Sequence, residues 1–138
     1  MKVKQAMHKT VNWQPPGTSL SEIAKIMKKE DIGAIPIGEN DRLIGMVTDR
    51  DIVVRGLSNG SNLSTLSARD VMTKRVLYCH EDDDIKDAVS LMKKNQVRRL
   101  PVLNGDKRMT GMLSLGDVSH STDHTVAGDL ARAVSAHH

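Results

Sequence analysis

Residues 20–29 read LSEIAKIMKK, and residues 85–94 read IKDAVSLMKK. The two stretches share their apolar positions and their final pair of lysines, and they lie 65 positions apart. Three more pairs match at an offset of 65 or 66: VKQAM at 3–7 with ARDVM at 68–72, IGAIPI at 32–37 with VRRLPV at 97–102, and GMVTDRD at 45–51 with GMLSLGD at 111–117. Four matching blocks in one order predict two tandem copies of a single structural unit.

Each copy contains the pattern of an amphipathic helix with one buried face. Its apolar residues recur at positions i, i+3, i+4 and i+7. They are Leu20, Ile23, Ala24 and Met27 in the first copy and Ile85, Ala88, Val89 and Met92 in the second. Ser19 and Glu22 form a capping-box signal before the first stripe, and Asp84 and Asp87 form a weaker acidic version before the second.

Two short apolar runs joined by a turn come next in each copy, and they predict a pair of strands. The turns lie at 38–42 and 104–108, and the second runs lie at 43–48 and 109–114. Pro36 and Pro101 fall inside the first runs, where a proline indicates an edge position or a bulge. A short helix is expected after each second run, with Thr48 or Ser114 as its N-cap.

The predicted organisation is a first repeat at residues 3–57, a connector at 58–67, a second repeat at 68–121 and a helical tail at 122–136. The connector is rich in Ser, Asn and Gly, which is typical of a loop. Val126, Leu130 and Val134 recur at every fourth position and predict the helix of the tail. Short strands and helices mixed in each copy place the chain in the α+β class.

Composition and charge narrow the possible functions. The net charge of +3 is spread over both halves, so a pI near 9.1 is weak support for nucleic-acid binding. Trp13 and Tyr78 are the only aromatic residues, which leaves few surfaces for stacked bases. No apolar run approaches the roughly 20 residues of a membrane-spanning helix. The start MKVKQAMHK lacks the apolar core of a secretory signal, so a cytoplasmic location is expected.

The two copies, each closing with apolar-x-Gly-apolar-apolar-[Ser/Thr]-x-x-Asp, resemble the cystathionine-β-synthase (CBS) domain family over residues 3–120. The chain looks most like small bacterial proteins that consist of one CBS pair. The resemblance implies a β-α-β-β-α unit per repeat and a pseudo-twofold Bateman module, with two small sheets packed together and helices outside. It also implies adenine-nucleotide binding in clefts between the repeats, and pairing of two copies into a homodimer.

The closing motif supplies the main candidate binding residues. A hydroxyl at the junction of a strand and a helix meets free N–H groups that favour an anion such as phosphate. A carboxylate three residues later accepts hydrogen bonds and suits the two hydroxyls of a ribose. By the resemblance, Thr48 and Ser114 contact phosphate, and Asp51 and Asp117 contact ribose. The alternative is that each hydroxyl only caps a helix and each carboxylate only supplies a favourable charge in its first turn.

Arg98 and Arg99 are further candidates, because the resemblance implies that basic residues at these positions reach the phosphate. The planar guanidinium pairs well with phosphate oxygens, although a surface ion pair is the alternative role. The first copy has Gly33 and Ala34 instead, so the two sites are expected to differ in strength. The resemblance also places backbone groups of each first strand against the purine: Thr10, Val11 and Asn12 in one copy, and Arg75, Val76 and Leu77 in the other. Trp13 either stacks on a base or packs.

Several other signals are interpreted as structural. The acidic run at 81–84 lacks the spacing and the glycine of a calcium loop, and is expected to favour the start of a helix. Cys79, the single cysteine, is expected to be buried and inert. The sequence contains no nucleophile elbow, phosphate-transfer loop or metal-ligand cluster, so we expect a binding module and not an enzyme.

The predicted function is regulatory. The module is expected to bind AMP, ADP, ATP or S-adenosylmethionine and to pass a conformational change to the second subunit or to an unidentified target protein. The alternative is a structural or stress-related dimer that binds no nucleotide. Gly33, Ala34 and the helical tail favour this alternative.

Overall fold

A computed structural model describes residues 1–9, 12–58, 60, 62–121 and 124–135. The chain divides into two compact units, which are best treated separately. The central unit is Asn12–Val76, and the terminal unit combines Met1–Val11 with Leu77–His138. The chain therefore passes from one unit into the other twice, once after Val11 and once after Val76.

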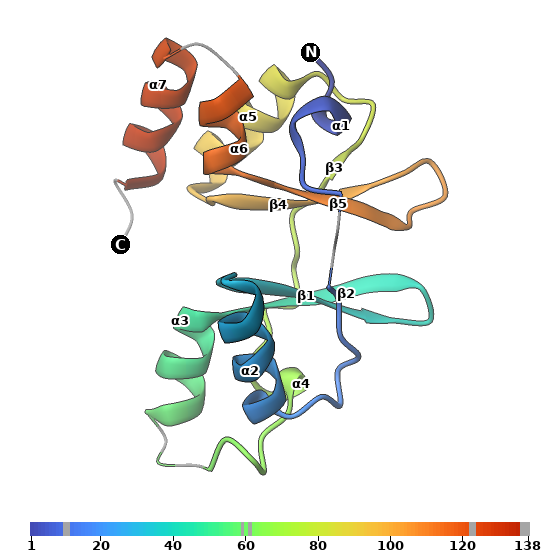
Figure 1. The fold of residues 1–138 in the computed structure, drawn as a ribbon, viewed down its shortest axis with the longest axis vertical. Helices are drawn as coiled ribbons and strands as arrows, with labels where there is room; N and C mark the ends of the chain where they lie inside the picture. Colours follow the sequence, from blue (N-terminus) through green and yellow to red (C-terminus); the bar gives the residue numbers. More distant parts are fainter. Residues whose placement is uncertain (10–11, 59, 61, 122–123, 136–138) are drawn as a thin grey trace. The chain divides into compact units, whose positions relative to one another are not determined.

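The units differ from the two sequence repeats, because the short helix that begins each repeat lies in the other unit (Figure 1). Helix α1 (Val3–Ala6) belongs to the terminal unit, where Val3 is fully buried and its N–H donates to the Asp83 carbonyl at 2.9 Å. Helix α4 (Ala68–Val71) belongs to the central unit, where the N–H of Ala68 donates to the Thr18 carbonyl at 2.8 Å. Each unit is thus built from both repeats.

The central unit holds an antiparallel hairpin and the helices that pack with it. Its elements are α2 (Leu20–Glu30), β1 (Ala34–Glu39), β2 (Arg42–Thr48), α3 (Asp49–Asp51), the π-helical segment η1 (Ile52–Leu57) and α4. The hydroxyl of Ser19 caps α2 by accepting the N–H of Glu22 at 3.1 Å, as the capping-box signal predicts. The apolar stripe of α2 faces the core, and its Leu20 and Ile23 are fully buried.

The terminal unit holds a three-stranded sheet of order β3-β4-β5. Its elements after α1 are β3 (Cys79–His80), α5 (Ile85–Asn95), β4 (Arg99–Leu103), β5 (Met109–Ser114), α6 (Leu115–Ser121) and α7 (His124–Ser135). Strands β3 and β4 are parallel, with α5 as their crossover, and β4 and β5 form an antiparallel hairpin. The carboxylate of Asp84 caps α5 by accepting the N–H of Lys86 at 2.9 Å.

The tail forms α7, where the spacing of apolar residues predicts a helix. Leu130 and Val134 are buried in the core of the terminal unit, and Val126 packs against it. The predicted α+β fold class is confirmed, because each unit combines a small sheet with helices. Among the described helices, none is long and apolar enough to cross a membrane.

The expected first strand of each repeat is seen only in part, and Thr10 and Val11 of the first repeat lie outside the described residues. Among the described residues of the central unit it appears as one parallel bridge between Gln14 and Ile37, and Pro15 and Pro16, which follow at once, have no N–H with which to extend the pairing. In the terminal unit it covers only Cys79–His80. Arg75, Val76 and Leu77 precede this strand, at the point where the chain leaves one unit for the other.

The two strand prolines differ in position: Pro36 lies in β1, a strand of a two-stranded sheet, as the edge alternative expects. Pro101 lies in β4, the middle strand of its sheet, so the edge alternative is wrong for this residue. It is tolerated because β3 pairs only with Val102 and Leu103, and no strand needs an N–H from position 101 on that side. The pairing register shifts one residue further along, between Val102 and Leu103, and the hairpin that contains Pro36 shifts between Ile37 and Gly38.

Candidate functional site

The two closing motifs form the same reciprocal hydrogen bonds. In the central unit, the N–H of Thr48 donates to Asp51 Oδ2 at 2.9 Å, and the N–H of Asp51 donates to Thr48 Oγ1 at 3.1 Å. In the terminal unit, the N–H of Ser114 donates to Asp117 Oδ2 at 2.8 Å, and the N–H of Asp117 donates to Ser114 Oγ at 3.1 Å. These are capping boxes at the ends of β2 and β5, where a short helix begins.

The capping role that the sequence left open is therefore present in both copies, and it does not use all the hydrogen-bonding capacity of these groups. Each hydroxyl accepts one N–H and keeps its own proton, which it can donate outward. Each carboxylate uses Oδ2 for the cap, so the cap itself leaves Oδ1 for a second interaction. The arrangement thus fixes one hydroxyl donor and one carboxylate acceptor side by side in each unit.

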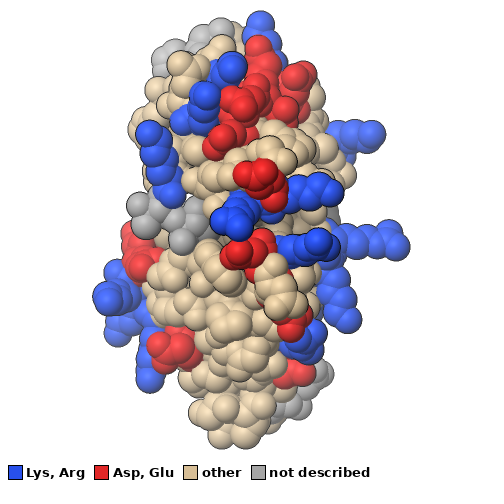
Figure 2. All heavy atoms as spheres, turned by 90° about the vertical axis from the view of Figure 1, so that its right-hand side faces the viewer, with Lys and Arg blue, Asp and Glu red and all other residues tan. Residues whose placement is uncertain are grey.

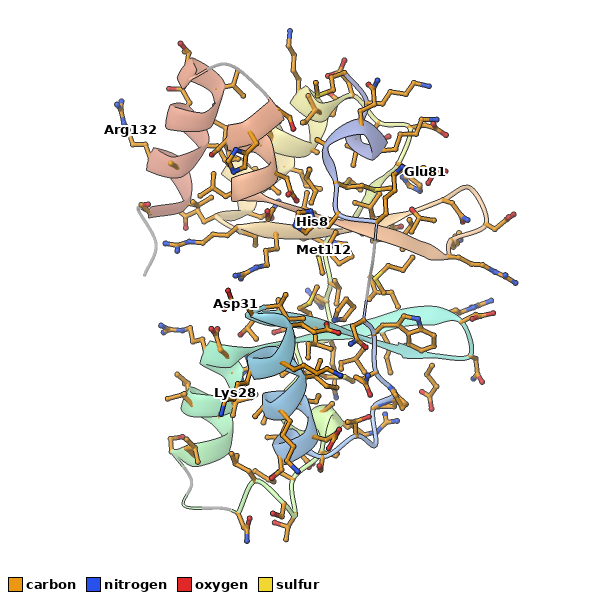
Figure 3. All side chains as sticks on the ribbon, in the orientation of Figure 1. His8, Lys28, Asp31, Glu81, Met112 and Arg132 are labelled. Atoms are coloured by element: carbon orange, nitrogen blue, oxygen red, sulfur yellow. The ribbon has the colours of Figure 1, made fainter. Side chains whose placement is uncertain are left out.

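A segment from the other repeat lies against each closing motif. In the central unit, Thr73 and Met46 exchange backbone hydrogen bonds of 2.9 and 3.1 Å. In the terminal unit, His8 and Met112 exchange two hydrogen bonds of 2.9 Å, and Figure 3 shows these two residues side by side. His8 and Thr73 occupy equivalent positions of the repeat, 65 residues apart. The backbone around the two motifs is therefore the same, and the side chain at this position differs.

The two aspartates differ in burial and in partners. Asp117 is 8% exposed, and its Oδ1 lies 3.2 Å from Nδ1 of His8, so both of its oxygens are engaged. Asp51 is half-buried, and its Oδ1 makes no hydrogen bond or ion pair with any residue that the structure describes. The carboxylate of the central unit is thus open on one side, and that of the terminal unit is closed by an imidazole.

Arg98 and Arg99 lie beside Ser114. The carbonyl of Arg98 accepts the N–H of Leu115 at 2.8 Å, and Arg99 pairs with Ser114 across the β4–β5 hairpin. Both arginines are exposed, and in the described part of the chain their side chains form no ion pair. The structure therefore places their backbones next to the closing motif of the terminal unit, a neighbourhood that the sequence could not assign.

The positions of the central unit that match Arg98 and Arg99 carry no cationic side chain, because they are Gly33 and Ala34. The carbonyl of Gly33 accepts the N–H of Asp49 at 3.0 Å, and Ala34 pairs with Thr48. Ala34 is buried, so positions 33 and 34 offer only backbone groups, and the cation within this closing motif is the exposed Arg50. The sequence predicts that the two copies differ in positive charge at these positions. In the structure, the terminal and central units differ in the same way.

The remaining candidates are dispersed. Thr10 and Val11 lie outside the described residues. The side-chain amide of Asn12 donates to Glu30 Oε1 at 2.7 Å, and its Oδ1 accepts the side-chain amide of Gln14 at 3.2 Å. Asn12 is therefore committed to structural hydrogen bonds through its side chain, which leaves its backbone as the predicted contact to a base.

The candidates of the second copy sit in the connecting segment. Arg75 is exposed, Val76 is half-buried, and Leu77 packs against the core of the terminal unit.

Trp13 lies against Gly38, whose hypothetical Cβ would be 2.7 Å from the indole Cε3, and 43% of Trp13 is exposed. The packing role for Trp13 is thus seen directly.

Sequence reasoning missed His8. The matched blocks end at Met7 and Met72, so the next residue of each copy was left out of the comparison. Extending the alignment by one position would have paired His8 with Thr73 and shown a titratable side chain on one side only. Its contact with Asp117 has no local signal, because 109 positions separate the two residues.

Charged side chains of both signs are interspersed on the face drawn in Figure 2, in agreement with a chain that has no basic block. In the acidic run, Asp82 lies 3.0 Å from Lys4 and 3.6 Å from Lys2, and the hydrogen bond from Lys4 lowers the pKa of the Asp82 carboxyl. Among the described residues, no three His, Cys, Asp or Glu side chains gather as metal ligands would.

Comparison with known proteins places these observations in a family. The family model described as CBS domain matches the chain twice, at residues 3–57 and 68–122. Hypoxic response protein 1 of Mycobacterium tuberculosis is 36% identical over 110 residues, which cover 78% of this chain and 76% of that protein. A crystal structure of Hypoxic Response Protein I with two coordinated zinc ions has a TM-score of 0.80 at 32% identity, over 89% of this chain and 100% of the other.

Two further similarities extend over most of both chains. The CBS domain-containing protein YhcV of Bacillus subtilis is 34% identical over 117 residues, which cover 85% of this chain and 82% of YhcV. The CBS domain pair of protein MJ0100, crystallised with 5′-methylthioadenosine and S-adenosyl-L-methionine, has a TM-score of 0.78 at 26% identity. The match covers 88% of this chain and 98% of that one.

Proposed function

Because the chain belongs to the CBS-domain family, we propose that it is a regulatory module that binds an adenine nucleotide or an adenosyl compound and changes conformation on binding. The observation that supports this proposal most is the duplicated pair of hydroxyl and carboxylate, Thr48 with Asp51 and Ser114 with Asp117. A single capping box needs only a structural explanation. Two copies, each with a carboxylate oxygen beyond the cap, favour a common ligand chemistry.

The chemistry of each pair suits a nucleoside with an anionic group. The carboxylate oxygen Oδ1 accepts the two hydroxyls of a ribose, and the hydroxyl of Thr48 or Ser114 donates to a phosphate or carboxylate of the ligand. Arg98 and Arg99 add two cations near Ser114, and guanidinium groups pair with phosphate bidentately. The backbone of residues 10–12 and 75–77 then supplies hydrogen bonds to the base.

The MJ0100 pair supports the adenosyl part of this proposal, since its crystals contain two adenosyl compounds. It does not distinguish between AMP, ADP, ATP and S-adenosylmethionine for the present chain. The proposed role is that of a sensor, in which the ligand acts by its different affinity for two conformations. No step in it requires a catalytic group.

The test is calorimetric titration of the full chain with AMP, ATP and S-adenosylmethionine. Asp51→Asn and Asp117→Asn keep an oxygen that can accept the capping N–H but remove the charge from the proposed ribose contact. Each is expected to weaken one class of site about tenfold, which is the order of a charge-assisted hydrogen bond. Asp70→Asn is the matched control, because Asp70 forms the same capping box with Ser67 at the start of α4.

The possible results separate the two hypotheses cleanly. Saturable binding that is reduced in both site variants and unchanged in the Asp70 variant supports the proposal. Normal binding in all three variants would show that the ligand binds elsewhere. Flat titrations of the wild-type chain with every ligand would favour the alternative, a structural dimer, and size measurement in solution would then decide whether two copies pair.

A further inference from the structure

We propose that the side chain of His8 competes with the ligand for the Asp117 carboxylate. This one side chain then makes the affinities of the two ligand sites unequal. The inference rests on the proposed function, because it assumes that Asp51 and Asp117 receive a ribose. It adds to that function a residue that sets the affinity of one site and leaves the other untouched.

The imidazole of His8 contacts the Asp117 carboxylate, which is the group proposed to bind the ribose. Nδ1 of His8 lies 3.2 Å from Oδ1 of Asp117, the oxygen that the capping box does not use. Since Oδ2 already accepts the N–H of Ser114 and the imidazole lies against Oδ1, a ribose hydroxyl must compete with the imidazole for the Oδ1 side of the carboxylate. Asp117 is also only 8% exposed, so a ligand has little access to its carboxylate while the imidazole lies against it.

The backbone of His8 cannot move with its side chain. It exchanges two hydrogen bonds with Met112, and its carbonyl oxygen would lie 2.7 Å from a Cβ on Gly111. The imidazole, in contrast, is 78% exposed, so a change of its side-chain rotamer frees Asp117 without disturbing the sheet. The backbone of His8 is therefore fixed, while its imidazole can still rotate away from Asp117.

The central unit provides an internal comparison. Thr73 stands at the position of His8 and makes the same pair of backbone hydrogen bonds, here with Met46. Its short side chain forms no hydrogen bond with Asp51 in the described part of the chain, and Asp51 keeps an open oxygen. The same fold thus presents an open carboxylate when Thr occupies the position and a closed one when His does.

The arginines beside Ser114 act in the opposite direction. Arg98 and Arg99 attract an anionic ligand to the terminal unit, and His8 opposes the contact of its ribose with Asp117. A ligand must therefore displace the imidazole before it gains both contacts there. Its ribose meets no such obstruction at Asp51.

The experiment exchanges the two side chains. His8→Thr gives the terminal unit the residue of the central unit, and Thr73→His does the reverse. Both positions are exposed and keep their backbone pairing, so both variants are expected to fold, and their melting temperatures check this. His80→Thr is the control, since His80 is an exposed histidine 3.9 Å from Asp83 and outside the site.

Each variant is titrated with AMP by calorimetry, and the site is identified by the binding that Asp117→Asn or Asp51→Asn reduces. His8→Thr is expected to tighten the Asp117-dependent site about tenfold, the order of a charge-assisted contact, because the contact between the imidazole and the carboxylate no longer has to be broken. Thr73→His is expected to weaken the Asp51-dependent site by a similar factor. With 2′,3′-dideoxy-AMP, which lacks the ribose hydroxyls, His8→Thr is expected to give no gain.

The outcomes distinguish this inference from the function on which it rests. If Asp117→Asn weakens AMP binding while His8→Thr leaves it unchanged or weakens it, the function stands and competition by His8 is wrong. If AMP binds equally well to wild type, Asp51→Asn and Asp117→Asn, or does not bind at all, the site assignment fails and the inference fails with it. A gain that persists with the dideoxy nucleotide also contradicts competition for the ribose.

Discussion

Gly111 lies directly beneath the side chain of Met7, so that a Cβ at this glycine would be only 2.5 Å from the Met7 sulfur. The same Cβ would lie 2.7 Å from the carbonyl oxygen of His8. Gly45 has the equivalent relationship to Met72, at 2.5 Å, but all three of its nearest atoms belong to the flexible methionine side chain. In each unit, a segment of the other repeat thus packs directly against the glycine of the closing motif.

The first prediction compares these two glycines. Gly111→Ala must push a backbone carbonyl aside and is expected to destabilise the protein by about 2 kcal/mol, as overpacking does. Gly45→Ala displaces only a side chain and is expected to cost less than about 1 kcal/mol. Urea unfolding measures both values. Gly105→Ala, a turn glycine with no neighbour within 4 Å, is the control, and equal losses for Gly111 and Gly45 would contradict the argument.

The second prediction concerns the tail. Leu130 is fully buried between α7 and the rest of the terminal unit, so Leu130→Ala leaves a cavity and is expected to cost about 2–5 kcal/mol in the free energy of unfolding. Asp129→Ala, on the exposed side of the same helix, is expected to change it by less than about 0.5 kcal/mol. Urea denaturation measures both. Equal stability of the two variants would mean that α7 is not docked on the core.

The third prediction is that the only cysteine does not react in the folded protein. Cys79 is buried in β3, and its burial, with a smaller effect of Asp83, raises the pKa of the thiol to about 12. At pH 8 roughly one thiol in ten thousand is then ionised, and the thiolate is the reactive form. Iodoacetamide is expected to label Cys79 only in urea. Rapid labelling without urea would show that the strand opens readily.

The same shift in pKa predicts how stability depends on pH in the alkaline range. In the unfolded chain the thiol ionises near its usual value of 9.0, whereas in the folded chain it stays protonated until about pH 12. The unfolded state therefore releases a proton first, and the free energy of unfolding falls as the pH rises between these values. Cys79→Ala is the reference, since the contribution of the thiol is absent from it. Parallel pH profiles for the two proteins would contradict the prediction.

The fourth prediction tests a local signal of the sequence. The hydroxyl of Ser19 accepts the N–H of Glu22, and no other side chain caps α2 in the described residues, so Ser19→Ala is expected to cost about 1 kcal/mol. Ser90→Ala, at an exposed position inside α5, is expected to be neutral or slightly stabilising because Ala has the higher helix propensity. Thermal unfolding of the two variants distinguishes a cap from a general effect of losing a serine.

Elements with a strong local pattern were predictable. The stripes of α2 and α5, their caps at Ser19 and Asp84, and the hairpin turns are all found where periodicity and turn residues indicate them. The weakest prediction was the first strand of each repeat, because a short extended segment has no periodicity of its own. Pro15 and Pro16 cannot extend the pairing of Gln14, and in the second repeat the strand begins at Cys79, after residues 75–77.

The candidate site was predictable only in part. Thr48, Asp51, Ser114 and Asp117 share a motif, so their pairing within each copy followed from the spacing, and the structure shows it as four hydrogen bonds. Their ligand remains a prediction. The neighbourhood of Arg98 and Arg99 depended on the register of β4 against β5, and the offset between the two repeats does not specify how strands pair within one repeat.

The sequence by itself determined the repeat, the helices and strands of each copy, and the caps, because these depend on residues a few positions apart. Only the tertiary structure decided which copy each leading helix joins. The two repeats are similar and present similar surfaces. The local sequence of α1 or α4 therefore does not indicate whether the helix packs against its own repeat or against the other one. That exchange brings His8 from one end of the chain onto Asp117 near the other, and it makes two nearly identical motifs chemically different.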